Sequence, residues 1–367
     1  MAFTVDHKYM ARALDLAAKG RGRVSPNPMV GAVIVKNGRV IAEGYHRGAG
    51  KDHAEVVALK KAGKQARGAT VYVTLEPCCH TGNTGPCTEA LIAAGVRKVV
   101  FPSHDPDPRV SGKGARRLRQ VGIEVVKGIL AGEAERLNES YYAHNLTGRP
   151  FVILKIAQTL DGRIAARNGD SQWVSGPPSL KMVHRLRSEV DAVAVGMGTV
   201  KADDPSLTVR LVKGKNPYRV IVAGSDKIPP RSKLLSNNSD FKTIVAAGEK
   251  AIDRLARRRR SGNLIYWKVR TGRNGLLDLS DLLMKAGEFG LRSILVEGGA
   301  ALATSFIKAR LVNKLVLVIA PKLLGEGIEA IADLGLRKLS DAVAVRDMTI
   351  ERVGQDLVCT GYPVWKA

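Results

Sequence analysis

A histidine, a glutamate and two cysteines near the start of the chain have types and spacing suited to metal-dependent hydrolysis. His53-Ala-Glu55 is followed by two Pro-Cys pairs that end at Cys78 and Cys87, which matches the His-x-Glu and Pro-Cys pattern of zinc enzymes that deaminate a nucleobase. An imidazole nitrogen and two thiolates suit Zn²⁺, and three protein ligands leave the fourth tetrahedral position open for water. The sequence therefore predicts one catalytic zinc ion per chain, bound by His53, Cys78 and Cys87.

Glu55 is the predicted catalytic residue of this site. It lies two residues beyond His53, where it can reach a water on the metal without binding the metal itself. Zinc lowers the pKa of a bound water to about 7. A carboxylate can take the proton of that water, pass it to a ring nitrogen and then help the amine leave as ammonia. Glu55 is therefore expected to act first as a base and then as an acid.

The cysteine spacing leaves alternatives open. Eight residues separate Cys78 from Cys87, whereas the usual signature has two residues between its cysteines. Cys79 competes as a ligand, although neighbouring side chains rarely reach one tetrahedral ion together, and the Pro-Cys pairs favour Cys78 and Cys87. A structural zinc site or unrelated thiols are the other interpretations.

The elements that would position these residues follow an α/β pattern. Residues 6–19 have apolar side chains at helical spacing, and the β-rich runs 30–35 and 40–44 are joined by Asn37-Gly38, which is typical of a tight hairpin turn. Helices and strands then alternate, which predicts a layered sheet with parallel strands. The expected helices are 53–62, 87–94, 114–121 and 131–145, and the expected strands are 70–75, 98–101 and 123–126. His53 and Cys87 both begin predicted helices.

A short breaker segment at 146–150 divides the chain into predicted domains 1–146 and 147–367. The second part alternates again and predicts a second α/β sheet, and residues 348–364 have the alternation of two antiparallel strands. The strands are expected near 151–157, 191–196, 219–223, 243–247, 264–269, 293–297 and 314–319, and the helices near 178–188, 278–287 and 300–309.

Length and composition agree with two globular domains. The chain has 367 residues, of which 45% are hydrophobic and 25% charged, whereas one core rarely grows beyond about 250–300 residues. No apolar run is long enough to cross a bilayer, and the first residues do not have the pattern of a secretory signal. Four cysteines in so long a chain are no disulfide framework. These features predict a cytoplasmic protein with no membrane partner.

The net charge of +24 is the strangest feature of the composition. It is compatible with nucleic acid, with a membrane surface or with phosphorylated small molecules. The excess is spread over both halves, and the dense cluster at 254–260, which includes Arg257–Arg260, is interpreted as a solvated face. The alternative is a nucleic-acid-editing deaminase whose basic second domain binds RNA phosphates.

The motifs together resemble the bifunctional deaminase/reductase family of bacterial riboflavin biosynthesis, over essentially the full chain. The motifs of the deaminase half are Ser25–Val35, Gly44–His46, His53–Glu55, Leu75–Cys78, Asp105–Pro108 and Gly112–Gly114. The resemblance implies a cytidine-deaminase-like α/β/α layered domain. It also accounts for the long spacing between the cysteines.

By the same resemblance, three further residues would bind the pyrimidine beside Glu55: Asn27, His46 and His80. Without the resemblance, Asn27 is a turn residue between prolines and His46 ends a strand. The chain departs from the family where Asn83 replaces a basic substrate-contacting residue, and where Asp107 stands in place of a common Asn. These departures leave the recognition of the base and the phosphate undecided.

Glycine-rich turns at 196–199 and 297–300 follow apolar strands in the second half. Such turns let phosphates approach a helix start, but neither is the Gly-x-Gly-x-x-Gly fingerprint, so a Rossmann site is not supported. The matching segments resemble the reductase half of the same family, which implies a dihydrofolate-reductase-like α/β domain that uses NADPH. These segments are 155–163, 171–176, 183–187, 191–200, 203–210, 296–299 and 320–325.

The resemblance carries two residue sets into this half. The implied NADPH-binding residues are Ala157, Ser171, Trp173, Thr199, Asp203, Gly299, Ala300, Ala301, Leu302, Ala303, Thr304 and Ser305. The implied substrate-binding residues are Lys155, Arg187, Leu207, Arg210 and Glu297. Taken alone, Trp173 would be interpreted as a core residue and Arg187 as a solvated helix residue. No strong general acid is visible in this half.

The implied function has two steps and one small-molecule substrate. Zinc-dependent deamination of 2,5-diamino-6-(5-phosphoribosylamino)pyrimidin-4-one gives the uracil, and reduction by NADPH then gives 5-amino-6-(5-phosphoribitylamino)uracil. In the second step the cofactor supplies the hydride and the protein positions it against the sugar. The expected partners are this substrate and further copies of the chain in a homo-oligomer, with no nucleic acid.

Overall fold

A computed structural model of the chain describes residues 5–81, 85–224, 228–229, 231–236, 243–258, 264–273 and 275–366, with the side chains of 254–258 left out. The chain forms two compact units, Met1–Thr147 and Gly148–Ala367. This division falls one residue after the boundary predicted at 146. Among the described residues, no helix is long and apolar enough to cross a membrane.

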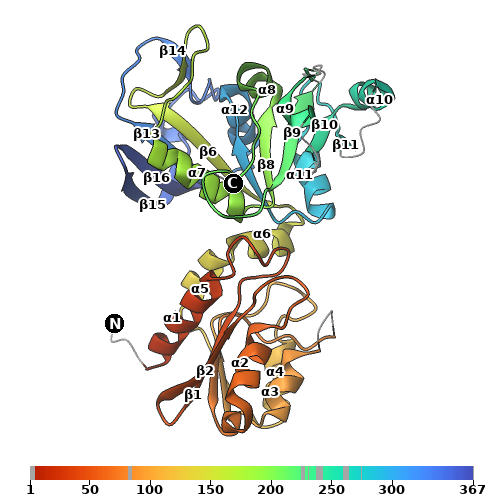
Figure 1. Cartoon of the computed structure of the whole chain (residues 1–367), viewed down its shortest axis with the longest axis vertical. Coiled ribbons are helices and arrows are strands. Elements are labelled where there is room, and N and C mark those ends of the chain that lie inside the picture. Colours follow the sequence, from red (N-terminus) through yellow and green to blue (C-terminus); the bar gives the residue numbers. More distant parts are fainter. Residues whose placement is uncertain are drawn as a thin grey trace. The chain divides into compact units, whose positions relative to one another are not determined.

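The first unit is a five-stranded sheet between two layers of helices (Figure 1). Strands β2, β1 and β3 are antiparallel, and β3, β4 and β5 are parallel. Helices α2, α3 and α4 cover one face, and α1 and α5 cover the other. The elements are α1 Val5–Ala18, β1 Gly31–Lys36, β2 Arg39–Tyr45, α2 Ala54–Ala62, β3 Thr70–Val73, α3 Cys87–Ala93, β4 Lys98–Phe101, α4 Lys113–Gln120, β5 Glu124–Lys127, α5 Ala131–Leu137 and α6 Glu139–Thr147, with a short 3₁₀ turn at Gly63–Ala66.

Glycines let two helices approach the sheet closely in this unit. A Cβ at Gly31 on β1 would lie 2.1 Å from the carbonyl oxygen of Ala13, and one at Gly44 on β2 would lie 2.4 Å from that of Ala54. Ala54 is the first residue of α2. The close contact with Gly44 therefore fixes the end of α2 that carries His53. The hairpin turn has positive φ at both Asn37 and its following glycine, as the sequence predicts.

The second unit is built on a nine-stranded sheet in the order β11-β10-β9-β8-β12-β6-β13-β16-β15. The strands from β11 to β13 are parallel, and β16 and β15 complete the sheet in antiparallel pairing. The strands are β6 Phe151–Thr159, β7 Arg163–Ala166, β8 Ala192–Gly196, β9 Tyr218–Gly224, β10 Thr243–Ala247, β11 Leu264–Lys268, β12 Ser293–Glu297, β13 Lys314–Ala320, β14 Gly327–Glu329, β15 Ala344–Val353 and β16 Asp356–Val364. The helices are α7 Pro177–Glu189, α8 Met197–Asp203, α9 Lys233–Ser236, α10 Glu249–Arg258, α11 Leu279–Glu288 and α12 Ala300–Lys308, with a 3₁₀ turn at Leu339–Asp341.

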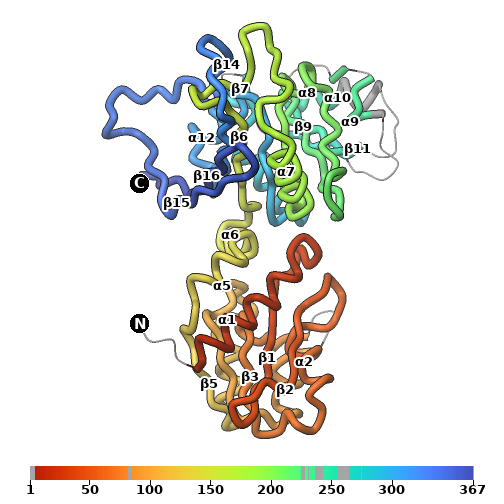
Figure 2. The backbone as a smooth tube through the Cα atoms, turned by 60° about the vertical axis from the view of Figure 1, so that its left-hand side comes forward, coloured from red at the N-terminus to blue at the C-terminus, as the bar shows by residue number. Residues whose placement is uncertain are grey.

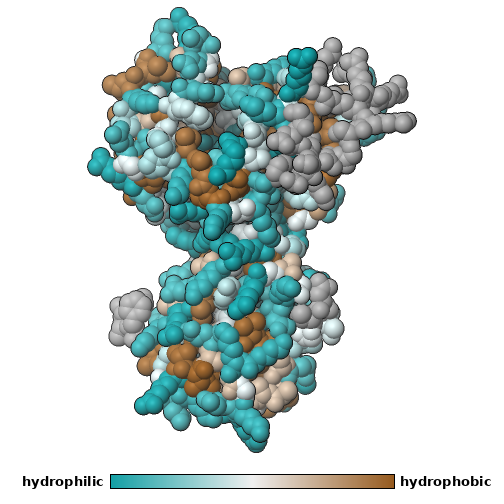
Figure 3. Space-filling model, viewed as in Figure 1, coloured by the Kyte–Doolittle hydropathy of each residue, from teal (hydrophilic) through white to brown (hydrophobic). Residues whose placement is uncertain are grey.

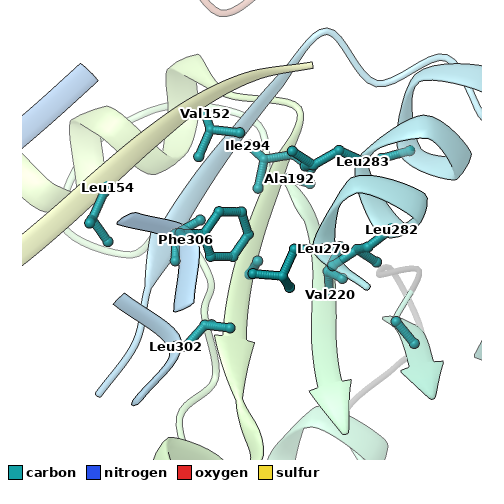
Figure 4. Close-up of a cluster of buried hydrophobic side chains, with 14 of the residues drawn as sticks. Val152, Leu154, Ala192, Val220, Leu279, Leu282, Leu283, Ile294, Leu302 and Phe306 are labelled. Carbon is teal, nitrogen blue, oxygen red and sulfur yellow. The ribbon is translucent and has the colours of Figure 1, made fainter. Parts of the chain in front are cut away.

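Hydrophobic side chains cover both faces of this sheet. On one face, Phe306 of α12 and Leu282 of α11 pack with Val152 and Ile294 of the strands (Figure 4). The other face has its own cluster, in which Leu234 of α9 is fully buried. Burial on both faces explains why these strands are continuous apolar runs in the sequence.

Most predicted elements are present, and the differences have local causes. The expected helix at 131–145 is two helices, because the chain breaks at Asn138, whose side chain bonds the backbone of Met29. The elements β7, α8, α9 and β14 have three to seven residues, too few for a period to predict them. Helix α10 has ten residues and overlaps the cluster at 254–260, which the sequence placed in a helix or a loop. The antiparallel pair expected at 348–364 is the β15–β16 hairpin (Figure 2). The arginine cluster at 254–260 lies outside the described side chains.

Candidate active sites

The predicted zinc ligands meet in the first unit. His53 Nδ1 lies 3.2 Å from Cys87 Sγ and 3.6 Å from Cys78 Sγ, and the three ligand atoms all lie within 4.8 Å of one another. In a tetrahedral zinc site with bonds of about 2.1 Å to nitrogen and about 2.3 Å to sulfur, such ligand atoms are about 3.5 Å apart. The donor set and its spacing therefore fit one zinc ion. Among the described residues, Cys79 is not part of the cluster.

Two helix starts and one loop hold these three side chains. His53 precedes the first residue of α2, and Cys87 is the first residue of α3. Cys78 follows β3, and its Sγ accepts a hydrogen bond from the backbone N–H of Cys87 at 3.3 Å. Hydrogen bonds with Cys87 and His53 lower the pKa of Cys78 to about 4. A thiolate is thus favoured at Cys78, which is the form that binds zinc.

Glu55 lies in the first turn of α2 beside the cluster and is 4% exposed. Burial, and after it the negative charge of Cys78, raises the pKa of Glu55 to about 7. A carboxyl group that titrates near neutral pH can both accept and donate a proton under working conditions. This is the property that the predicted base-then-acid role requires.

Asn27 and His46 extend the same site. The amide Nδ2 of Asn27 donates to Nε2 of His46 at 3.1 Å, and Nδ1 of His46 donates to the carbonyl oxygen of Asp52 at 3.1 Å. The two partners assign the proton to Nδ1. The ring of His46 meets that of His53 edge-on, with 5.5 Å between their centroids. Three residues that are separate in the sequence are therefore placed side by side.

His80 is close to the cluster in sequence and is half-buried. Its Nδ1 is buried without a hydrogen-bond partner among the described residues. The pKa of Asp107 lies below its usual value, mainly because Arg109 donates a hydrogen bond to its carboxylate. The nearby His80 ring contributes to the same lowering. Asn83, the other departure named above, lies outside the described residues.

Two residues that the sequence did not single out hold this site together. Glu76, buried at 3% exposure, accepts hydrogen bonds from the backbone N–H groups of Gly112 and Ala115, both at 2.9 Å, and bonds His104 at 2.8 Å. It thereby ties the start of α4 to the segment that carries Cys78. Asn138 bonds both backbone groups of Met29 and so fixes the loop of Asn27. A lone Glu or Asn gives no sequence signal for such distant partners.

A cavity of about 1660 Å³ lies at the carboxyl ends of the parallel strands in the second unit. Pockets for one drug-sized ligand measure roughly 300–1,000 Å³, so this one has room for a dinucleotide together with a substrate. Its walls include predicted residues of both sets: Lys155, Ala157, Ser171, Trp173, Arg187, Thr199, Asp203, Leu207, Arg210, Glu297, Gly299, Ala300, Ala301, Leu302 and Ser305.

A buried ion-pair cluster forms the polar end of this cavity. Arg187 on α7 bonds both carboxylate oxygens of Glu297, at 2.6 and 3.0 Å, and Nζ of Lys155 lies 3.7 Å from the same carboxylate. Burial lowers the pKa of Lys155. Burial opposes ionisation of Glu297 too, but Arg187 and Lys155 hold the pKa of that carboxyl below its usual value. Arg187 is thus not a solvated helix residue.

The predicted NADPH residues fall into two groups in the structure. In the first group, the hydroxyl of Thr199 accepts a hydrogen bond at 3.1 Å from the N–H of Gly299, which precedes α12. In the second, the hydroxyl of Ser171 lies 3.4 Å from Oδ1 of Asp203. Trp173 is 64% exposed at the cavity, so it is not a core residue. The open start of α12 at the cavity wall suits a phosphate group, and the size of the cavity fits the cofactor.

Ala303 and Thr304 lie away from the cavity. Ala303 is fully buried in the hydrophobic cluster, and the hydroxyl of Thr304 accepts a hydrogen bond from the N–H of Ala332 at 2.8 Å. A helix turns once in 3.6 residues, so an unbroken run from 299 to 305 cannot face one pocket. The structure separates these two residues from the rest of that set.

The fold and the two sites define a metal-dependent deaminase unit joined to a reductase-type unit. Residues 3–103 match the family model described as cytidine and deoxycytidylate deaminase zinc-binding region, and residues 150–359 match the model described as RibD C-terminal domain. The second match alone covers more than half of the chain.

Relatives of known name share this arrangement over nearly the whole chain. Riboflavin biosynthesis protein RibD of Aquifex aeolicus is 44% identical, with 96% of this chain and 97% of the relative covered. RibD of Escherichia coli is 42% identical, with 96% and 98% covered. The chain belongs to the RibD family of bifunctional deaminase/reductase enzymes of riboflavin biosynthesis.

Solved structures agree with this assignment. RibD of Acinetobacter baumannii has a TM-score of 0.89 at 35% identity and covers 99% of this chain and 100% of its own. The diaminohydroxyphosphoribosylaminopyrimidine deaminase/5-amino-6-(5-phosphoribosylamino)uracil reductase of Thermotoga maritima has a TM-score of 0.87 at 36% identity, with 98% and 99% covered. The alternative of a nucleic-acid-editing deaminase is not favoured.

Proposed function

We propose that the chain deaminates 2,5-diamino-6-(5-phosphoribosylamino)pyrimidin-4-one in residues 1–146 and reduces the product to 5-amino-6-(5-phosphoribitylamino)uracil in residues 147–367. One observation carries the proposal: a His53–Cys78–Cys87 cluster with Glu55 beside it occurs in the same chain as a large cavity with a buried Arg–Glu–Lys cluster. Either site alone would support only half of the reaction sequence.

In the deaminase, His53, Cys78 and Cys87 would hold zinc, which when bound supplies an activated water at neutral pH. Glu55 would accept a proton from the attacking water as its oxygen bonds to the ring carbon, and would pass that proton to the adjacent ring nitrogen. It would then transfer the remaining hydroxyl proton to the amine, so that the C–N bond breaks and ammonia leaves. Asn27 and His46 orient the pyrimidine, because their hydrogen bond fixes both side chains next to His53. His80, whose Nδ1 is buried without a hydrogen-bond partner among the described residues, adds a further contact.

In the reductase, NADPH supplies the hydride that C1′ of the ring-opened ribose accepts. Thr199, Asp203, Ser171, Ala157 and Trp173 hold the cofactor, together with the residues at the start of α12 that line the cavity. Arg187, Arg210 and Leu207 bind the substrate with Glu297, whose carboxylate Arg187 orients. Lys155, the buried ammonium next to Glu297, binds or polarises the ribose.

The partners and the compartment follow from the same proposal. The substrate and the cofactor are phosphorylated small molecules, so basic residues at the two sites need no nucleic acid to explain them. Thiolate ligands at Cys78 and Cys87 and two further free cysteines suit a reducing compartment, and we place the enzyme in the cytoplasm.

We also propose that the chain forms a homo-oligomer through the second unit. β15 is an edge strand of the nine-stranded sheet and exposes Met348 and Ile350 at 56% and 62%. The segment between β14 and β15 loops out from the unit (Figure 2) and exposes Leu339 at 93%. Figure 3 shows further hydrophobic residues on the surface near β14. Exposed apolar patches of this kind and open edges mark interfaces.

A coupled assay tests the two-step proposal. The zinc-loaded enzyme is given the diaminopyrimidine phosphate with NADPH, and ammonia release and NADPH oxidation are followed together. We expect one ammonia released for each NADPH oxidised, with ammonia appearing first, and NADPH oxidation without ammonia when the deaminated substrate is given. Oxidation of NADPH without prior ammonia release from the diamino compound would contradict the proposal.

A further inference from the structure

His184 is a buried titratable residue of the reductase cavity with no role in the function proposed above. It lies on α7, lines the cavity together with Leu207, Arg210 and Leu211, and is 6% exposed. Arg187 follows it by three residues on the same helix, so the two side chains project from neighbouring positions of one face. His184 therefore lies next to the groups that are proposed to bind the substrate.

The hydrogen bonds of His184 define its protonation state. Nδ1 accepts the backbone N–H of Arg210 at 2.8 Å, and the N–H of Leu211 points to the same nitrogen at 3.5 Å. Two donors directed at Nδ1 require that this nitrogen carry no proton, so the neutral ring has its proton on Nε2. A doubly protonated ring would place a donor against these donors.

The charges around the ring favour the same neutral form. Arg187 comes from α7 itself, Arg210 from the segment that follows α8, and Glu297 from β12. Burial, followed by the charges of Arg187 and Arg210, lowers the pKa of His184 to about 4, and the opposite effect of Glu297 is smaller. The ring is therefore neutral throughout the physiological pH range.

The segment that His184 bonds carries an otherwise exposed side chain. Arg210 is exposed, and its guanidinium makes a single hydrogen bond to the hydroxyl of Thr208, at 2.8 Å, among the described residues. The backbone around it is held by three side chains: His184 bonds Arg210, Arg187 bonds the carbonyl of Thr208 at 3.3 Å, and Asn216 bonds the N–H of Val209 at 2.7 Å. Two side chains of α7, His184 and Arg187, thus help to hold the backbone from which Arg210 projects.

We propose that His184 is a positioning residue of the reductase, which fixes the backbone at Arg210 and so directs the Arg210 guanidinium at the anionic substrate. This inference rests on the proposed substrate-binding role of Arg210. It adds a pH dependence to that role. Because the pKa of His184 is lower in the folded chain than its ordinary value of 6.5, the hydrogen bond is fully present above pH 6.5 and is lost as the pH falls through 4.

Two substitutions distinguish positioning from a merely structural role. In His184→Leu the ring is replaced by an apolar side chain with no acceptor, so we expect the KM for 5-amino-6-(5-phosphoribosylamino)uracil to rise about tenfold, the effect of one lost hydrogen bond, with kcat and the KM for NADPH little changed. In His184→Gln an amide oxygen can accept the same N–H group. We expect this variant to keep the wild-type KM at pH 7.5.

The pH profile supplies the second readout. The substrate's phosphate titrates at about pH 6 and affects wild type and His184→Gln alike, so the ratio of the wild-type KM to that of His184→Gln is compared. The ratio should stay near one from pH 7.5 to 5.5 and should rise as the pH falls through 4, because His184 becomes protonated there and glutamine does not titrate. Binding of the same compound is also measured by calorimetry without NADPH, so that the result does not depend on turnover. Should His184→Leu fail to fold, the comparison of wild type with His184→Gln at two pH values still decides.

Equal KM values for His184→Leu and wild type, an impaired His184→Gln at pH 7.5, or a KM rise near pH 4 of equal size in wild type and His184→Gln would each overturn the inference. These outcomes are separate from a failure of the proposed function. If the wild-type enzyme neither binds nor reduces the aminouracil, the proposed function itself is wrong and the inference falls with it. If the wild type does both and His184→Leu matches it, only the role of His184 is wrong.

Discussion

Cys78 and Cys79 are neighbours in the chain with different surroundings. The thiol of Cys78 is bonded by Cys87 and His53, which lower its pKa to about 4. Burial raises the pKa of the Cys79 thiol instead, and Cys79 is outside the ligand cluster. The sequence favoured Cys78 through its Pro-Cys pair and kept Cys79 only as a competing ligand, because the two residues are adjacent. Only the direction of each side chain separates them.

Cys87→Ser and Cys79→Ser form a matched pair for zinc binding. Cys87→Ser removes a ligand, so we expect its zinc content to fall well below one ion per chain and ammonia release to be lost with it. Cys79→Ser should keep about one zinc per chain. Metal analysis of the two purified variants checks this. Equal zinc contents, or loss of zinc in Cys79→Ser, would contradict the assigned ligand set.

Asp105 gives a stability prediction whose sign depends on pH. Burial raises the pKa of Asp105 to about 6 from 3.8, so its contribution to folding is most favourable below pH 3.8 and is lost as the pH rises through 6. Its Oδ1 accepts hydrogen bonds from Tyr141 and from the N–H of Asp107, which an asparagine can retain. Asp105→Asn should therefore stabilise the first unit by about 1–3 kcal/mol at pH 7.5.

Calorimetry of the first unit's transition at two pH values checks the prediction for Asp105. The gain should shrink nearly to zero at pH 4, where the wild-type carboxyl is already protonated in the folded chain. Destabilisation of equal size at both pH values would show instead that the native carboxylate is needed.

At the scale of an element, α7 depends on a residue far away in the sequence. Asp356 at the start of β16 is buried and accepts hydrogen bonds from the N–H of Gly176, at 2.8 Å, and from the hydroxyl of Ser179, at 2.5 Å. It thereby caps the helix that carries His184 and Arg187. Helix N-termini have unpaired N–H groups that need such acceptors.

Asp356→Ala should lower the free energy of unfolding of the second unit by about 2–3 kcal/mol, because two buried donors lose their acceptor. All three tryptophans lie in this unit, so urea unfolding followed by tryptophan fluorescence reports on it alone. Glu351→Ala on the exposed strand β15 is the control and should change stability by less than about 0.5 kcal/mol. An effect of Asp356→Ala no larger than that of the control would rule out the capping role.

The elements that the sequence predicted well are those with a clear hydrophobic periodicity or with distinctive turn residues at their ends. The hairpin at Asn37 and the buried parallel strands of both sheets are present where the pattern places them. α8 and β14 were missed because short segments carry too little periodicity. The split between α5 and α6 was missed for another reason: Asn138 takes part in a contact with Met29, which is 109 residues away, and no local pattern reports such a contact.

The predicted site shows the same division. The residue types and their spacing form a recognisable motif, so His53, Cys78 and Cys87 could be predicted as metal ligands from the sequence alone. Glu76 and His184 act through backbone groups of distant segments, and a backbone group has no residue type to recognise. The stretch from Gly299 to Ser305 was predicted as a continuous run, although helix geometry separates Ala303 and Thr304 from the cavity.

At the scale of the whole molecule, the exposed edge of the second unit predicts self-association. Light scattering with size exclusion should give at least twice the chain mass of 39.4 kDa. Ile350→Glu places a charge on the exposed strand β15 and should shift the protein to monomers. Val121→Glu substitutes an exposed apolar residue of the first unit, 42% exposed against 62% for Ile350, and should leave the assembly unchanged. A wild-type monomer, or an equal effect of the two variants, would contradict the proposed interface.

The central claim is that one chain carries two separate active sites, and Glu55→Gln tests it most directly. Glutamine keeps the size of the side chain but cannot carry the proton. In one preparation of zinc-loaded enzyme, ammonia release from the diaminopyrimidine phosphate should fall by about 100-fold or more, while NADPH oxidation with the deaminated substrate stays within twofold of wild type. Loss of both activities, or of neither, would contradict the account.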